Sequence, residues 1–389
     1  MRQRLVCLDV LRGATVALMI LVNNQGSWAH VPAPLRHAEW NGCTPTDMVF
    51  PFFLFIVGGA MALSLEPARE AGAPRGPLMR KVVRRGVLII LLGLALNLFP
   101  AGLPLDPTAA HAFKPYFVTA AVEHLRLPGV LQRIGACWLL AASLIVLVPQ
   151  ARRRLAVAAG LLVLYEALMR LPLVPGWGAG SFGPTDNFAH WVDLHVFGAT
   201  HLLSGAQNTD PEGLVPNLSA TLGTLLGFAV VRWLTKGPMV TVRLVRLLGA
   251  GAALAGLALL LRPLEPINKH LWTPNYVMYT GGLAMMFLAF FAWAIDVRGW
   301  RRGLRPFEAY GFNPLLVFWG SGLLARLLSH SRWSIGGADP VSLYTLIYRH
   351  VYASWAGPMA GSVLFAVGMV LFWLAVSLVL HRRGWAWRV

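Results

Sequence analysis

Long apolar runs recur along this chain, and they constrain its fold more than any other feature. Hydrophobic residues make up 57% of the sequence and charged residues 13%, whereas soluble domains carry about 25% charged residues. A helix of about 20 apolar residues crosses the roughly 30 Å of hydrocarbon in a bilayer. Ten segments fit that length, at about 8–24, 47–65, 83–99, 130–148, 154–171, 216–234, 244–261, 275–295, 307–328 and 359–381. The sequence therefore predicts an all-α polytopic integral membrane protein with one transmembrane domain over residues 1–389.

Charge divides the connections between these segments into two classes. Basic residues gather in short connections, at 69–85, 152–154, 232–246 and 298–305, and in the tail. Such loops are typical of the cytoplasmic side, so both termini are expected in the cytoplasm and the number of crossings is expected to be even. The loops expected outside lie at about 25–46, 100–129, 172–215, 262–274 and 329–340. Residues 341–355 are short and contain Arg349, so they are expected to form an interfacial or re-entrant helix.

The net charge of +17 does not indicate nucleic-acid binding, because no basic and aromatic recognition module accompanies it. Ionisable residues inside membrane spans are costly and are candidates for function. Arg12 is three residues from Asp9, so it forms either a structural ion pair or a ligand contact. Gln132 and Arg133 open the fourth span. Arg84 and Arg85 are either a topology signal that contacts lipid phosphate or part of a site for a phosphorylated cytosolic cofactor.

Three polar stretches interrupt the apolar sequence outside the membrane. The first, HAEWNGCTPTD, contains His37, Trp40, Asn41 and Asp47 directly before an apolar, aromatic span. DPEGLVPN supplies Asp210 and Glu212, and PINKHLWTPN supplies Asn268, Lys269 and Trp272. Hydrogen-bonding groups beside aromatic faces suit a sugar, although Asp210 and Glu212 are also explained as helix or turn caps. The histidines near residue 195 match no zinc spacing, so no metal is expected.

Together these motifs resemble the heparan-α-glucosaminide N-acetyltransferase family of transmembrane acyltransferases. The matching pieces are RLVCLDVLRG, LVNNQG, HAEWNGCTPTDMVFPFFLFIVG, RKVVRRG, GVLQRIG, DPEG, PINKHLWTPNYVMYTGG and GFNPL, in the family's order. The resemblance implies that acetyl-CoA is taken from the cytosolic face and that its acetyl group passes to a glucosamine-type amino sugar on the other side. It also implies His37 as the active histidine, with Asn23 beside it and Asp47 at the family's acidic position. A bacterial member in the cytoplasmic (inner) membrane is expected, and a homodimer is an expected assembly with no interface assigned.

The residue chemistry is compatible with that implication. A histidine takes a proton from an attacking amine near neutral pH, or carries the acyl group itself, so His37 is a general base or an acyl relay. Asn23 is a candidate to stabilise the oxyanion. Coenzyme A is expected to bind at Arg12, Arg84, Arg85, Gln132, Arg133 and Asn313. The sugar is expected to bind at Trp40, Asn41, Asp210, Glu212, Asn268, Lys269 and Trp272. Two alternatives stay open: O-acetylation of a periplasmic or cell-surface glycan, and a non-enzymatic amino-sugar permease.

Overall fold

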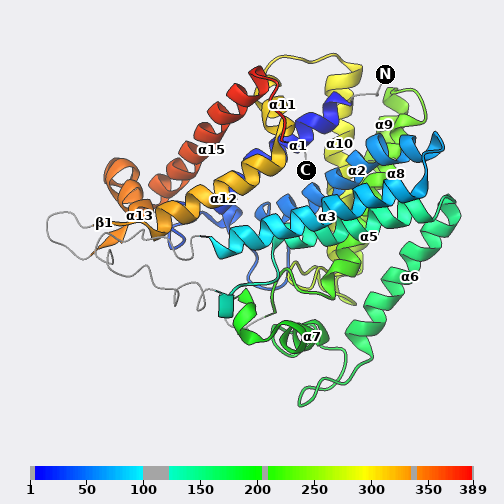
Figure 1. Ribbon diagram of the computed structural model, residues 1–389, viewed down its shortest axis with the longest axis horizontal. Coiled ribbons are helices and arrows are strands. Elements are labelled where there is room, and N and C mark those ends of the chain that lie inside the picture. The colour runs from blue at the N-terminus through cyan, green and yellow to red at the C-terminus, as the bar shows by residue number, and fades with distance from the viewer. Residues whose placement is uncertain (1–4, 100–121, 204–208, 334–339, 388–389) are drawn as a thin grey trace.

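The computed structural model describes residues 5–99, 122–203, 209–333 and 340–387, and these residues are mostly helical (Figure 1). Ten long helices carry the architecture: α1 (Val6–Asn23), α2 (Val49–Glu70), α3 (Arg75–Leu98), α5 (Val130–Leu147), α6 (Ala151–Arg170), α8 (Pro216–Thr235), α9 (Thr241–Leu260), α10 (Pro274–Phe291), α12 (Pro314–His330) and α15 (Pro358–Arg382). Shorter elements connect them: α7 (Phe188–Phe197), α11 (Arg305–Phe312), α13 (Leu343–Ile347), α14 (Ser354–Ala356), and the antiparallel strands β1 (Arg332–Trp333) and β2 (Val341–Ser342).

Nine of the ten predicted segments coincide with one long helix each, whereas the segment predicted at 307–328 is divided between α11 and α12. By length and composition alone, seven helices are able to cross a membrane, and the pair α11 and α12, bent by 82°, makes an eighth if it counts as one span. The helices α3 and α6 begin with arginine-rich turns, which shorten their apolar stretch. Apart from the two short strands, the described residues confirm a helical protein with several helices of membrane-spanning length. The number of ten crossings and the position of the termini stay predictions.

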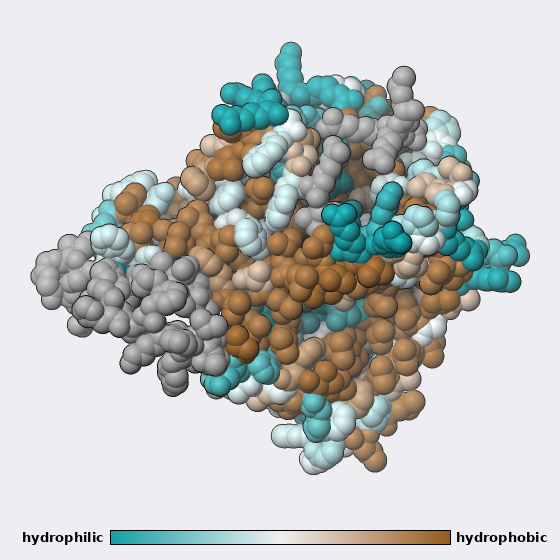
Figure 2. Space-filling view, in the orientation of Figure 1, coloured by the Kyte–Doolittle hydropathy of each residue, from teal (hydrophilic) through white to brown (hydrophobic). Residues whose placement is uncertain are grey.

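The surface supports the membrane assignment. In Figure 2, hydrophobic side chains cover the middle of the visible face, and hydrophilic ones gather toward its upper and lower edges. Only 28% of the apolar window is buried in α9, and the same fraction in α15. Large apolar side chains such as Leu260 and Leu371 are 74% and 58% exposed. A helix that is apolar on its exposed side is stable in hydrocarbon but not in water.

Glycine contacts bring the central helices unusually close together. A Cβ atom on Gly58 of α2 would lie 1.8 Å from the carbonyl oxygen of Thr224, and one on Gly227 of α8 would lie 1.9 Å from that of Phe55. The helices α2 and α8 therefore cross with backbone against backbone. Small residues allow this approach between membrane helices. The same arrangement joins α1 to α11, where Gly13 faces the carbonyl oxygen of Phe307.

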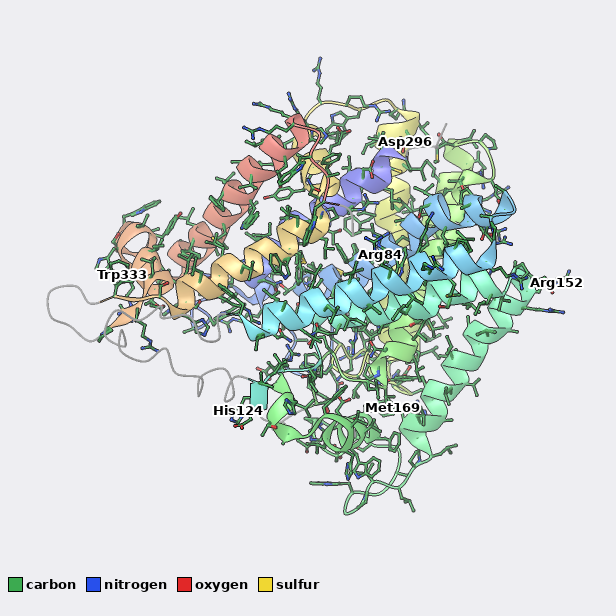
Figure 3. All side chains as sticks on the ribbon, in the orientation of Figure 1. Arg84, His124, Arg152, Met169, Asp296 and Trp333 are labelled. Atoms are coloured by element: carbon green, nitrogen blue, oxygen red, sulfur yellow. The ribbon has the colours of Figure 1, made fainter. Side chains whose placement is uncertain are left out.

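The two classes of loops lie at opposite ends of the helices. At one end of α2, Glu66 is 2% exposed and contacts Arg69, Arg154 and Arg232, which ties α2, α6 and α8 together. At its other end α2 begins beside His37 and Asp47. Figure 3 shows Asp296 at the upper side of the molecule and Arg152 at its right edge, and His124 and Met169 in its lower half. The separation expected from the loop charges is present, while the side that faces the cytoplasm stays a prediction.

The doubtful segment near residues 341–355 forms a broken run of short helices, with a π-helical stretch over Tyr348–Ala353 between α13 and α14. It is too short to cross the hydrocarbon as one helix. Its predicted place at the interface stays a prediction. Parts of three predicted outer loops, residues 100–121, 204–208 and 334–339, lie outside the described residues.

Candidate active site

A histidine and an aspartate form a close pair at the mouth of α2. The Nδ1 atom of His37 lies 2.6 Å from Oδ1 of Asp47. Asp47 is in a 3₁₀ turn, Thr46–Met48, that leads into α2. Its Oδ2 atom accepts hydrogen bonds from the backbone N–H of Ala38 and from the N–H and hydroxyl of Thr44. The Asp47 side chain is 1% exposed, whereas that of His37 is 43% exposed. The carboxylate is therefore fixed, and it orients an imidazole that remains accessible.

The pair also fixes the tautomer of the imidazole. Ionised Asp47 only accepts hydrogen bonds, and the cationic amine of Lys269 lies 3.3 Å from its Oδ1 atom, which favours the ionised form. The short contact therefore requires that His37 carry a proton on Nδ1 and donate it to Asp47. The lone pair of a neutral ring is then on Nε2. Lys269 Nζ is also 2.9 Å from His37 Nδ1, and we read that contact as proximity imposed by the shared carboxylate, because both groups are donors.

A nearby thiol is not a competing nucleophile. Burial, followed by the negative charge of Asp47, raises the pKa of Cys43 to about 12, and the charge of Lys269 offsets only part of this. The thiolate is the reactive form of cysteine, so Cys43 stays protonated and unreactive at neutral pH. The His37 imidazole is therefore the candidate reactive group at this position.

His37 opens into a cavity of about 330 Å³ between α1, α2, α5 and α12. Polar side chains line one part of it, and they are Asn23, His37, Thr46, Arg126, Glu212, Lys269 and His270. The remainder is apolar and reaches Leu315 and Phe318 in the first turns of α12. Of the residues predicted for the site, the structure thus brings together Asn23, His37, Glu212 and Lys269, from four separate parts of the sequence. Asn23 ends α1, and its side-chain amide has no hydrogen-bond partner among the described residues, so it is available to a ligand.

The other residues predicted to bind sugar form the wall behind this cavity. The Asn268 amide donates to the Trp40 carbonyl and to the Asn41 side chain. The Trp40 ring lies 4.9 Å from the ring of His270. These contacts attach the PINKHLWTPN loop to the loop that carries His37, and so they set the position of Lys269. The structure therefore places Trp40, Asn41 and Asn268 as supports of the cavity lining, and their contact with sugar stays a prediction.

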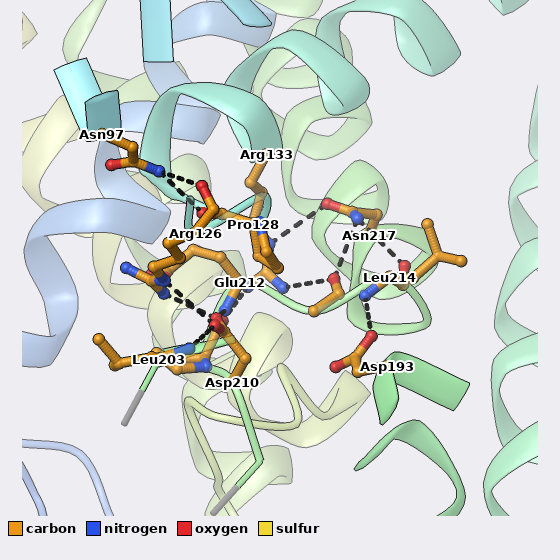
Figure 4. Close-up of polar contacts among 12 residues, drawn as sticks. Asn97, Arg126, Pro128, Arg133, Asp193, Leu203, Asp210, Glu212, Leu214 and Asn217 are labelled. Atoms are coloured by element: carbon orange, nitrogen blue, oxygen red, sulfur yellow. Dashed lines mark hydrogen bonds and ion pairs between the residues drawn. The ribbon is translucent and has the colours of Figure 1, made fainter. Parts of the chain in front are cut away.

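Arg126 was not predicted, yet it organises the acidic side of the cavity (Figure 4). Its guanidinium binds both oxygens of Asp210, at 2.7 and 3.1 Å, and one oxygen of Glu212. Burial alone would lower the pKa of Arg126, but the charges of Glu212 and Asp210 raise it above its ordinary value. Asp210 is fully buried and also accepts from the backbone N–H of Leu203 and Glu212. Arg126 is a charged residue four positions before the predicted span 130–148, and that position in the sequence could have identified it as a candidate.

Arg133 is held by protein groups instead of lining the cavity. It is 1% exposed and donates to the carbonyl oxygens of Pro211 and Gly213 (Figure 4). Its guanidinium also lies 4.7 Å from the ring centroid of Trp272. Trp272 is 1% exposed and has φ +50°, a conformation that costs energy in a bulky residue and persists only where packing enforces it. The two residues hold the DPEG loop against the PINKHLWTPN loop, and this role is structural in the conformation seen here.

The remaining residues predicted to bind the cofactor do not line the cavity. Arg12 contacts Asp9 at 3.0 Å and the Gly311 carbonyl at 3.3 Å. Arg84 and Arg85 are exposed on α3, and Figure 3 places Arg84 midway along that helix. The Gln132 side chain fits against Gly93 of α3. Contact of these residues with coenzyme A stays a prediction.

Asn313 lies at the break between α11 and α12 and is 2% exposed. Its amide donates to the Trp385 carbonyl at 2.7 Å and accepts from the Trp387 N–H at 2.8 Å. The end of the described chain therefore occupies both hydrogen-bonding arms of Asn313. A coenzyme A molecule that contacts the Asn313 side chain would have to displace residues 385–387.

The part of the chain that the structure describes contains no cluster of metal-ligating side chains. No group of three or more His, Cys, Asp or Glu side chains is placed there to hold a metal ion. Burial lowers the pKa of His190 and raises that of Asp193 to about 7, but these two groups belong to the interior of the α7 region and do not line the cavity.

Comparisons with known proteins agree with the motifs. A family model described as "Heparan-alpha-glucosaminide N-acetyltransferase, catalytic" matches residues 4–177. The chain is 24% identical to heparan-alpha-glucosaminide N-acetyltransferase of Mus musculus and 28% identical to that of Homo sapiens, and each alignment covers 99% of this chain. The chain spans about 60% of the length of these relatives. The resemblance predicted from the motifs is thus confirmed: the chain is similar to the heparan-alpha-glucosaminide N-acetyltransferase family model over residues 4–177 and to these two relatives over 99% of its length.

Proposed function

We propose that this protein is a transmembrane acetyltransferase that moves the acetyl group of cytosolic acetyl-CoA to an amino sugar of the glucosamine type on the other side of the membrane. The family relationship supports the reaction class. The observation that carries the proposal is the His37–Asp47 pair at a cavity that reaches the first turns of α12. The cavity connects an accessible base to the interior of the helix bundle, where a pantetheine arm would reach it.

In the proposed reaction, the acceptor amine attacks the thioester carbonyl and His37 Nε2 removes a proton from the nitrogen. The C–N bond forms, the carbonyl π electrons move to oxygen, and collapse of the tetrahedral intermediate breaks the C–S bond. The imidazolium then returns the proton to the departing thiolate. Asp47 keeps Nε2 unprotonated before the attack and stabilises the positive charge of the ring afterwards. Asn23 donates to the developing oxyanion.

Charge in the polar part of the cavity supports an amine-bearing acceptor. Glu212 lines the cavity, and Arg126 engages only its Oε2 atom among the described residues. The second oxygen is available to bind the ammonium or a hydroxyl of a sugar. Lys269 is engaged by Asp47, so it does not add an unpaired positive charge that would repel the amine. The predicted roles of Glu212 and Lys269 in acceptor binding are part of this proposal.

The test is the substitution His37→Ala in purified protein that is supplied with acetyl-CoA and glucosamine. We expect release of free thiol and formation of the acetylated sugar to fall to the uncatalysed level, while the melting temperature stays close to that of the wild type. His30 lies in the same loop and is exposed, so His30→Ala is the matched control and should retain activity. Substantial activity in His37→Ala would remove the catalytic assignment.

The same assay separates the two alternatives. An acceptor whose amine is already blocked tests O-acetylation, since only its hydroxyl groups can react. The permease alternative is favoured by one observation, the 82° break between α11 and α12, because discontinuous helices form substrate sites in many transporters. Uptake of labelled glucosamine into proteoliposomes without acetyl-CoA would favour the permease and count against our proposal.

A further inference from the structure

An apolar groove between α8 and α9 ends at an arginine that has no partner in the part of the chain that the structure describes. The groove has a volume of about 360 Å³ and is lined by apolar side chains that include Val230, Leu247 and Met285. Trp233 and Arg246 stand at one end of it. The α8–α9 connection lies at the same side of the molecule as the start of α1 (Figure 1). This is the side that carries the basic connections.

Arg246 lies near the start of a helix that is able to cross a membrane. This helix is α9, and it starts at Thr241. Arg246 is five residues farther on, about 7.5 Å along the axis at 1.5 Å per residue. A long arginine side chain near a helix end extends to the membrane interface, where lipid phosphate groups can accept its hydrogen bonds. Arg246 is exposed, and no hydrogen bond or ion pair to it occurs among the described residues.

Neighbouring groups make this end of the groove positive. Arg243 is one turn earlier on the same face of α9, and its guanidinium lies 4.2 Å from the ring centroid of Trp233. Its donors contact the carbonyl oxygens of Trp233 and Pro238, so no carboxylate neutralises it. Trp233 is 40% exposed, as is typical of a tryptophan at a membrane interface. The groove is therefore apolar along its length and positively charged at the end that lies near the membrane interface.

We propose that this groove binds one phospholipid with an anionic headgroup, with an acyl chain along the trough and its phosphate at Arg246. Basic pockets between membrane helices recognise such headgroups. The opposite side of α9 has a second apolar groove of about 240 Å³, which no arginine or lysine lines. That groove suits acyl chains without a preference for the headgroup. The proposal does not depend on the acetyltransferase activity.

The experiment compares phosphatidylglycerol with phosphatidylcholine. The full chain in mild detergent receives each lipid at equal concentration, and native mass spectrometry measures the fraction of folded protein that retains it. One arginine near the surface contributes about 1 kcal/mol to the binding of anionic lipid, so Arg246→Gln should lower the preference for phosphatidylglycerol about fivefold. Arg262→Gln, at the opposite end of α9, is the matched control and should change nothing. Ala250→Phe fills the trough and should reduce retention with Arg246 intact.

Three outcomes would overturn the inference. The first is an unchanged preference in Arg246→Gln. The second is an equal loss in the Arg262→Gln control, which would indicate general attraction to the positively charged protein. The third is displacement of bound lipid by inorganic phosphate at comparable concentration, which would indicate a site for phosphate alone. Since native mass spectra report the intact folded species, a variant that folds poorly still gives a lipid ratio from its folded fraction.

Discussion

Replacing Asp47 by asparagine should remove the base without removing the fold of the site. The amide keeps one oxygen, and three donors compete for it: the backbone N–H groups of Ala38 and Thr44 and the Thr44 hydroxyl. The oxygen therefore stays on that side and the NH₂ group turns toward His37. Since the NH₂ group donates, Nδ1 of His37 must accept, and the ring proton moves to Nε2. The imidazole then has no lone pair to offer to the acceptor amine.

General base catalysis contributes about 10²–10⁴ in rate, which corresponds to about 2.7–5.4 kcal/mol at 1.36 kcal/mol per factor of ten. We therefore expect kcat to fall by about 10²–10⁴ in Asp47→Asn, with the KM for acetyl-CoA little changed. The melting temperature should stay near that of the wild type, because the loop donors keep their acceptor. Thiol release from acetyl-CoA, followed with a chromogenic thiol reagent, measures the rate. Asp186→Asn, outside the cavity, is the matched control.

If Asp47→Asn keeps more than about a tenth of the wild-type kcat, the tautomer argument is wrong and His37 does not act as the base that we describe. A large loss of melting temperature would point instead to a mainly structural Asp47. The combination of low kcat with an intact fold is the result that only the proposed positioning role produces.

Three further predictions concern stability and are read from melting temperatures. Burial raises the pKa of Asp193 from about 3.9 to about 7, and this effect exceeds that of the opposing hydrogen bond from the backbone of Leu214. The protonated Asp193 side chain therefore contributes stability that is fully present below pH 4 and is lost as the pH rises through 7. Asp193→Asn should then melt higher than the wild type at pH 8, by at most about 4 kcal/mol of unfolding free energy, and show a smaller gain at pH 5; a pH-independent difference would contradict this. Arg126→Gln leaves two buried carboxylates unpaired and should cost about 3 kcal/mol, whereas an unchanged melting temperature would mean that they are neutralised otherwise. Gly13→Ala places a Cβ atom 1.8 Å from the Phe307 carbonyl and should cost about 1–3 kcal/mol, while Gly249→Ala, in open space, should not destabilise.

The sequence by itself determined the class of fold, because hydrocarbon tolerates a backbone only when its hydrogen bonds are satisfied within the segment. Apolar length therefore predicted nine long helices at nearly their observed positions, and a tenth segment that the structure divides into α11 and α12. The polar stretch that precedes an apolar segment also marked the region of His37 and Asp47 as a candidate site, and the family resemblance implied their roles. The count of crossings could not be fixed in the same way, since α3 and α6 begin with charged turns and α12 is bent away from α11.

Only the tertiary structure decided which polar residues face the cavity. Lys269 follows His37 by 232 residues, yet their nitrogen atoms lie 2.9 Å apart, and no local pattern encodes that distance. Arg133 looked like a ligand contact in the sequence, but loop carbonyl oxygens and the Trp272 ring surround it in the structure. Hydrophobic periodicity is a property of one segment, whereas partners of a buried charge come from several. For that reason the helices were predictable from composition, and the roles of the charged residues depended on packing.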